Sequence, residues 1–466
     1  MDAAYETAQI PHHRREYLLM VKKTLLVRCR RAGCWKFADL VFVVAAMLWL
    51  SSAAPGQTGS FSFHRKPTGA APTPAKPVFT SSQPPAFEIP VEPLGFFAPG
   101  AIYQGQRESL VSLDFLDENK LLFTFHAPGL IHREGDRTAT ADERQIRAVV
   151  LSLPQGTVTA EALWTLHDRA RYLWMLNDGH FLLRNQSTLQ MGDASLELKP
   201  LFHFQGPLLW LELDPTQQLM VTNSAEPAGS KSQPGDVPSP WTASADVVPD
   251  ALKPDIVLRI LRRISGQVML VSRVRTTVHL PINAEGYLET LRGKGHEWVL
   301  DLNYFTGGNR LIGKLDSTCA PSLEFLTQTK VLVTTCNPDG GRWMVAMSTD
   351  GKHLWNASSP PTQIWPRLVR SPDGTRVARE TLKASHPVAT MAPLSFDDIK
   401  GQLVEVYDAE NGKRELMAPA SPILDGGGNV AISPSGRRVA ILNAGAIQVY
   451  ELPAPGQMLD GNPGNL

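Results

Sequence analysis

The stretch SPDGTRVA at residues 371–378 returns almost unchanged as SPSGRRVA at residues 433–440. In such a segment proline presets φ at the first turn position, a Ser or Asp side chain bonds the local backbone, and glycine accepts positive φ. Each copy lies between segments of alternating apolar and polar residues, such as RLVR before the first and RRVAILN within the second. The pattern therefore predicts a reused turn between two strands rather than a catalytic signature.

Similar turn signals recur after about residue 100 and form two series. Turns between a first and a second strand lie near residues 117–119, 176–183, 213–221, 283–291, 326–333, 371–378 and 433–440. Turns that follow a third strand lie near residues 151–158, 191–198, 263–270, 305–312, 348–355 and 408–416. The two series alternate, which predicts four-stranded antiparallel units in tandem. No long stretch has the helical period, so we expect little helix.

The shorter spacings within the first series, about 37 to 45 residues, match one propeller blade. The seventh unit lacks a strand before the folded part ends near residue 452. We expect residues 95–105 to supply it, because closing the ring removes an open sheet edge. The predicted fold is therefore all-β: a β-propeller of seven four-stranded blades, closed by an N-terminal strand and spanning residues 94–455. Six or eight blades are the alternatives.

The two Ser-Pro-x-Gly segments, 371–378 and 433–440, resemble the WD40-like repeats of TolB-type β-propellers. Blades of that family carry a Ser-Pro-Asp-Gly turn between their first and second strands. The resemblance implies a periplasmic protein that binds partner proteins. Prolyl-peptidase relatives carry a hydrolase domain as well, but this sequence has no Gly-x-Ser-x-Gly elbow and no residues left over for that domain.

Residues 1–54 have the order of a targeting segment. Basic residues between Lys22 and Lys36 precede the apolar run LVFVVAAMLWL at 40–50 and the small residues SSAA at 51–54. This order predicts a secretory signal cleaved after Ala53, and Met20 is an alternative start. A retained single-pass anchor is the other interpretation, although about 20 apolar residues are usual for a span. We expect a bacterial protein that is periplasmic or secreted, or else held at the inner membrane with its propeller outside the cytoplasm.

Residues 55–93 are rich in Pro, Ser, Thr and Ala. Such a composition cannot bury enough apolar surface to fold, so we predict a disordered linker. We expect the last residues, 456–466, to form a disordered tail.

Three polar insertions lengthen the predicted propeller, at residues 127–144, 223–254 and 383–400. Each follows the second strand of its blade and precedes the third. In antiparallel blades these connections emerge on the same face as the blade-to-blade connections, which we call the top face. Loops over a rigid scaffold often carry function, so we predict that this face binds the ligand or partner. The alternative is that the insertions are merely tolerated.

The insertions supply the candidate binding residues. Trp241 lies in a Pro/Ser-rich loop, where an exposed aromatic side chain would be a good contact residue. A metal site in the first insertion and acid–base carboxylates in the third are weaker hypotheses than solvated loops and turns. The candidates are His132, Arg133, Asp136, Trp241, Asp397 and Asp398.

Cys319 and Cys336 are the two cysteines beyond the targeting segment. Cys319 precedes the first strand of the fifth blade and Cys336 ends its second, so they face each other across a hairpin at the top rim. We predict a disulfide, as expected of an exported protein. Two buried free thiols are the alternative.

Composition limits the functional classes. The 45 basic and 45 acidic side chains balance, which argues against a nucleic-acid partner. No metal-ligand spacing occurs among the 12 histidines, and we expect neither a metal nor a cofactor. The predicted function is a non-catalytic, monomeric binding scaffold for a protein or glycan in the cell envelope. The alternative is an enzyme (a hydrolase, lyase or quinone-dependent dehydrogenase) acting in the central funnel. The apolar character of the predicted first strands favours the scaffold.

Overall fold

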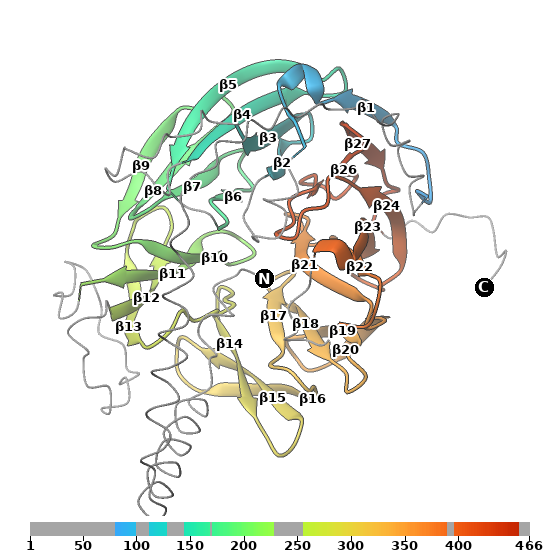
Figure 1. Ribbon diagram of the computed structural model, residues 1–466. Coiled ribbons are helices and arrows are strands. Elements are labelled where there is room, and N and C mark those ends of the chain that lie inside the picture. The colour runs from blue at the N-terminus through green and yellow to red at the C-terminus, as the bar shows by residue number, and fades with distance from the viewer. Residues whose placement is uncertain are drawn as a thin grey trace, which may run out of the picture. The chain divides into compact units, whose positions relative to one another are not determined.

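The computed structural model describes residues 80–98, 111–127, 144–167, 170–227, 255–388 and 396–455. Within these ranges the chain forms 27 strands and two short 3₁₀ turns, η1 (Glu92–Leu94) and η2 (Phe396–Asp398). The strands make seven antiparallel sheets arranged around a common centre (Figure 1). The predicted all-β propeller with seven blades closed by an N-terminal strand is confirmed.

Blades 1 to 3 follow the predicted order of strands. Blade 1 consists of β2 (Val111–Asp117), β3 (Lys120–His126), β4 (Arg144–Ser152) and β5 (Thr157–Leu166). Blade 2 consists of β6 (Leu173–Met175), β7 (Phe181–Asn185), β8 (Thr188–Gly192) and β9 (Leu198–His203). Blade 3 consists of β10 (Leu208–Leu213), β11 (Leu219–Glu226), β12 (Asp255–Arg262) and β13 (Val268–Val274).

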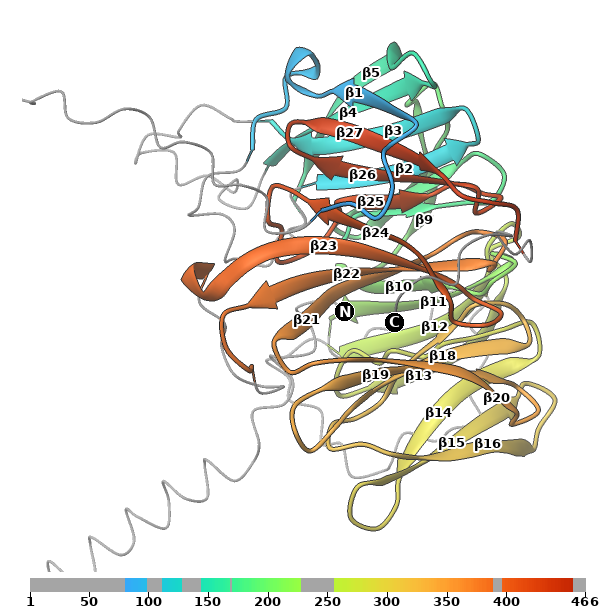
Figure 2. The ribbon, with the colours of Figure 1, turned by 90° about the vertical axis from the view of Figure 1, so that its right-hand side faces the viewer.

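Blades 4 to 6 continue the ring, and Figure 2 shows their strands running across the molecule from one face to the other. Blade 4 consists of β14 (Gly286–Arg292), β15 (Glu297–Tyr304) and β16 (Asn309–Asp316). Blade 5 consists of β17 (Ser322–Phe325), β18 (Lys330–Cys336), β19 (Arg342–Ser348) and β20 (His353–Ser359). Blade 6 consists of β21 (Gln363–Arg370), β22 (Arg376–Ala384), β23 (Ile399–Asp408) and β24 (Arg414–Ala420).

Blade 7 combines both ends of the folded chain. It contains β25 (Val430–Ile432), β26 (Arg438–Asn443), β27 (Ala446–Glu451) and, on its outer edge, β1 (Phe87–Pro90). The closing strand was expected at 95–105, so its position was wrong, and part of the range assigned to the linker is ordered. A proline harms an outer strand little, because the missing N–H faces solvent there. Ile89 anchors the strand by packing into the core.

Blade 4 departs from the four-stranded pattern. Its first strand is reduced to a single bridge between Ile282 and Tyr287, continued by a hydrogen bond from Leu288 N to Pro281 O of 2.9 Å. Just upstream, the backbone of Val278 is bonded instead to the side chain of Asn223 in blade 3, at 3.0 and 3.1 Å. The segment that would have been the inner strand is therefore attached to the neighbouring blade.

The core is divided among the blade interfaces. Seven apolar clusters each join two neighbouring blades. The cluster between blades 7 and 1, for example, contains Val449, Leu113 and Phe123. Because each sheet presents apolar side chains on both faces, the ring is stable only when every blade has two neighbours.

The SPDG turn folds as its sequence predicts. Ser371 Oγ accepts a hydrogen bond from Arg376 N at 2.9 Å and donates one to Asp373 Oδ1 at 2.5 Å. Gly374 has φ of 72°. The turn is therefore held by its own side chains, and the interpretation as turn chemistry is confirmed.

Turns of this series also bond to one another across the face opposite the insertions, which we call the bottom face. Ser435 N donates to Glu118 Oε1 at 2.7 Å, which joins blade 7 to blade 1. Asn177 N donates to Gln217 Oε1 at 2.5 Å and joins blade 2 to blade 3. Gln328 Nε2 reaches Asp214 Oδ2 at 3.0 Å, past the shortened blade 4.

Candidate functional site on the top face and the propeller axis

The predicted binding residues are only partly within the described chain. His132, Arg133, Asp136 and Trp241 lie outside the described residues. Asp397 and Asp398 form η2 at the entrance to β23. The carbonyl of Asp398 accepts a hydrogen bond from Ser385 N at 2.8 Å, and its carboxylate lies 3.8 Å from His386 Nδ1. These contacts join the two ends of the third insertion.

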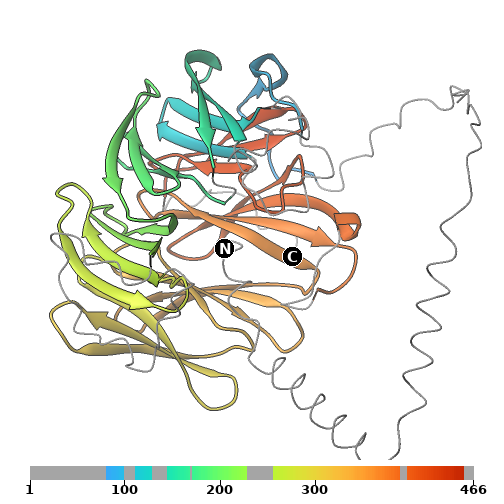
Figure 3. The same ribbon diagram turned by 60° about the vertical axis from the view of Figure 1, so that its left-hand side comes forward.

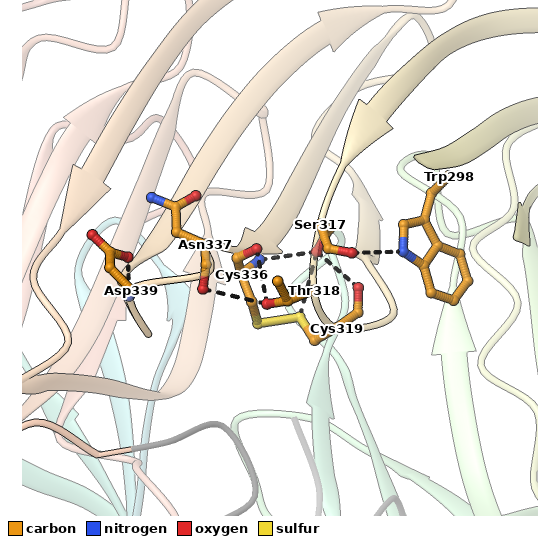
Figure 4. Close-up of a disulfide and its surroundings, with 8 residues drawn as sticks. Trp298, Ser317, Thr318, Cys319, Cys336, Asn337 and Asp339 are labelled. Atoms are coloured by element: carbon orange, nitrogen blue, oxygen red, sulfur yellow. Dashed lines mark hydrogen bonds between the residues drawn. A yellow bond between two sulfur atoms is a disulfide. The ribbon is translucent and has the colours of Figure 1, made fainter. Parts of the chain in front are cut away.

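The cysteines lie at the top of blade 5 with their sulfur atoms 2.13 Å apart, as a disulfide (Figure 4). Ser317, on the connection from blade 4, donates to Cys319 O at 2.7 Å and accepts from Cys336 N at 3.0 Å. Trp298 Nε1 donates to Ser317 O at 3.0 Å. The bridge therefore belongs to a network that connects the upper rims of blades 4 and 5.

Charged side chains on the inner strands were missed from the sequence. Strands β2, β10 and β17 each place one carboxylate among apolar neighbours, and β21 carries two arginines. Electrostatic interactions connect these residues across several blades, which places them around the propeller axis. The signal was a single charge within an apolar first strand, as in SLDF, WLEL and SLEF. The residues are Asp114, Arg171, Glu212, His279, Glu324, Arg367 and Arg370.

One group spans blades 3 to 6. His279 Nε2 lies 3.3 Å from Glu212 Oε2, and its ring centroid lies 5.2 Å from that of Trp210. Arg370 Nε lies 3.7 Å from Glu324 Oε1. Burial raises the pKa of Glu212 to about 8, despite opposing effects of Trp210, Arg370 and Arg171. Burial also raises the pKa of Glu324; Arg370 lowers it and Glu212 raises it further.

The side chain of Glu324 is 36% exposed, yet its pKa is raised. Protein atoms around the carboxylate still remove much of its hydration, which disfavours the charged form.

A second group lies between blades 6, 7 and 1. Burial raises the pKa of Asp114, while Arg367 lowers it, as does the hydrogen bond that Ser112 donates. Burial likewise raises the pKa of Glu380, and Arg367 lowers it. The glycine-rich segment 425–429 supplies backbone N–H groups to Glu380, and Gly428 has φ of 116°. These glycines thus bind a carboxylate of the chain itself.

The inner strands and the connections beside them bring three arginines, three carboxylates and one histidine around the axis. With its pKa raised to about 8, Glu212 can hold a proton near neutral pH, as acid–base groups at functional sites often do. In the part of the chain that the structure describes, no group of three or more His, Cys, Asp or Glu side chains is arranged to hold a metal ion. No helix of that part is long and apolar enough to cross a membrane.

Comparison with known proteins assigns no family to this chain. No family model matches the sequence, and no curated protein matches it. Among solved structures, acylaminoacyl peptidase from Pyrococcus horikoshii superposes with a TM-score of 0.44 and 8% identity; the match covers 75% of this chain and 52% of the peptidase. The chain thus spans about half the length of that enzyme.

Two smaller proteins superpose comparably. Sqt1 from Chaetomium thermophilum, bound to the N-terminus of a ribosomal protein, has a TM-score of 0.40 and 11% identity over 75% of this chain and 98% of that one. An uncharacterized protein from Listeria monocytogenes has a TM-score of 0.41 and 10% identity over 76% of this chain and 97% of that one. At these levels the likeness assigns neither a family nor a function.

Proposed function

We propose that this protein is an exported, monomeric β-propeller that binds a protein or glycan partner in the bacterial cell envelope through its top face, without catalysis of its own. The proposal takes residues 1–54 as a secretory signal or membrane anchor. It also takes the two Ser-Pro-x-Gly blades as members of the TolB-type, WD40-like family that they resemble.

The observation that carries the proposal is the difference between the two faces. On the bottom face, turns from neighbouring blades bond to one another, so their polar groups are already used within the protein. On the top face, the ends of β3 and β4, β11 and β12, and β22 and β23 bracket the three insertions. The disulfide of blade 5 stabilises the rim beside them. A rigid scaffold with variable loops on one face is the usual arrangement of a binding protein.

Site-specific photocrosslinking in cells tests this directly. A photoreactive residue placed at an exposed top-face position, Lys294, Asp339 or His386, is expected to capture the partner. The matched bottom-face positions are Gln155, Lys352 and Asn411, which are also exposed. Adducts that form from the bottom positions and not from the top ones would contradict the proposal. Recovery of the chain outside the cytoplasm without residues 1–53 would support export.

The axis favours a second candidate function, an enzyme of the hydrolase, lyase or quinone-dependent dehydrogenase kind. Glu212, with its pKa raised to about 8, is protonated at neutral pH and has the property of a general acid. A panel of ester, glycoside and peptide substrates would reveal this activity. Turnover that falls about 100-fold or more in Glu212→Gln would favour the enzyme over the scaffold.

A further inference from the structure

Among the described strands, β14 of blade 4 has an edge on its inner side that no other strand pairs. In the described part of the chain, the other six blades have four strands and blade 4 has three, and its inner position is filled by residues 281 and 282 alone. Beyond that bridge, β14 continues toward the top face, and its exposed residues include Glu289, Leu291 and Arg292. Figure 3 brings this hairpin and blade 3 forward. The upper part of this edge therefore lies toward the top face.

The backbone groups on this edge can be identified from the register. Leu288 pairs with Leu302 across β15 but sends its N–H the other way, to Pro281 O. Because the direction alternates along a strand, the N–H groups of Thr290 and Arg292 also point away from β15. No backbone hydrogen bond to either N–H from the inner side is found within the described residues. An unpaired row of donors and acceptors is a template for another strand.

Two acidic side chains lie together beside this edge. Glu289 on β14 lies directly opposite Asp301 on β15, so two carboxylates share one face of the hairpin. Arg292 lies on the other face, with its guanidinium over the ring of Trp298 at 5.9 Å. Glu212 of blade 3 and Glu324 of blade 5 are also acidic, but each already lies near a cationic side chain, His279 at 3.3 Å and Arg370 at 3.7 Å. The pair of carboxylates formed by Glu289 and Asp301 therefore favours a cationic neighbour on this edge.

We propose that an extended, lysine- or arginine-containing segment of the partner protein adds to β14 as the missing inner strand of blade 4. Its backbone would pair with Thr290 and Arg292, and a basic side chain opposite Glu289 would lie on the face that Glu289 shares with Asp301. Strand addition supplies affinity through the main chain, and the alternating side chains supply specificity. This inference rests on the proposed function, because it names the partner chemistry of the same top face.

The test uses the full protein with its Cys319–Cys336 disulfide formed, together with two fluorescently labelled peptides of about 12 residues. Thr alternates with Lys in the basic peptide and with Glu in the acidic peptide. Fluorescence anisotropy is expected to show saturable binding of the basic peptide and none of the acidic one. Thr290→Pro removes an outward N–H and should weaken binding about tenfold or more, whereas Thr290→Val keeps the N–H and should not. Glu289→Lys should shift the preference toward the acidic peptide, and Glu297→Gln, on the same hairpin, should leave it unchanged.

Hydrogen exchange separates the alternatives. The amides of Thr290 and Arg292 should exchange quickly in the free protein and slow down when the basic peptide binds. Slow exchange in the free protein would show that another part of this chain already covers the edge, and would overturn the proposal. So would peptide binding unaffected by both Thr290→Pro and Glu289→Lys, or no saturable binding at about millimolar peptide. If top-face positions still crosslink to the partner in the Thr290→Pro variant, strand addition is contradicted. The proposed scaffold function would be unaffected by that result.

Discussion

Glu380, on the second strand of blade 6, accepts hydrogen bonds from the backbone N–H of Gly428 at 2.9 Å to Oε1 and 3.1 Å to Oε2. Gly428 lies in the segment that leads into blade 7, and the side chain of Glu380 is fully buried. An anion-binding loop is thus used inside the protein, at the junction of two blades.

Replacing this carboxylate should destabilise the propeller. Glu380→Ala leaves buried N–H groups without their acceptor and removes a negative charge that interacts with Arg367, so we expect a loss of about 2–4 kcal/mol in the free energy of unfolding. Denaturant titration measures it. Glu161→Ala, at a half-exposed position of blade 1, is the control and should change stability by no more than about 0.5 kcal/mol. Equal effects of the two substitutions would contradict the role assigned to Glu380.

Glu212 should make stability depend on pH. Its pKa is about 8 in the folded protein against 4.5 for the unperturbed group, so the folded state binds the extra proton between these values. The stability that protonated Glu212 contributes to the folded state is therefore fully present below about pH 4.5, and it is lost as pH rises through 8. Relative to Glu212→Gln, the wild type should lose on the order of 1 kcal/mol per pH unit in this window. Parallel stability curves for the two proteins from pH 5 to 8 would refute this.

The cysteines should protect the protein from denaturant. Cys319 and Cys336 are separated by 17 residues, and closing a loop of that length stabilises a protein by about 3 kcal/mol. The double Cys319→Ser, Cys336→Ser variant should lose roughly that amount, and a reductant should lower the unfolding midpoint of the wild type but not of the variant. A thiol count on the processed, denatured protein should give no free thiol before reduction and two afterwards. Two thiols before reduction would show that the bridge does not form.

Gly374 should be more sensitive to substitution than its backbone conformation alone requires. Both Gly374 and Gly445 have positive φ, 72° and 80°. A Cβ at Gly374 would overlap the carbonyl oxygen of Leu326 in blade 5, whereas a Cβ at Gly445 meets nothing within 4 Å. Gly374→Ala should therefore cost about 1–2 kcal/mol more than Gly445→Ala in thermal or denaturant unfolding. Equal losses of stability in the two variants would mean that the contact between Gly374 and Leu326 can adjust without a loss of free energy.

The turn motifs account for most of what could be predicted about the fold. Ser371, Asp373 and Gly374 determine their turn through contacts within five residues, so the turn can be recognised without any knowledge of the tertiary structure. The closing strand could not be placed in the same way. Residues 87–90 are short and end in proline, and they become a strand only because β27 offers them an unpaired edge.

The candidate site was less accessible to sequence reasoning. Glu212, His279 and Glu324 come from three blades, and nothing in their local sequence indicates that they share one environment. The open edge of β14 was equally hidden, because the turn before Gly286 looks like the others in its series. The difference arises where Asn223 of blade 3 binds Val278 and draws the chain away from β14.

The sequence by itself thus determined the number of blades, the order of their strands and the face that carries the insertions, because turns and strand periodicity depend on neighbouring residues. Only the tertiary structure decided which segment closes the ring, which charges meet at the axis and which blade keeps an open edge. Those features depend on contacts between residues far apart in the chain, which exist only once the blades have assembled into a ring.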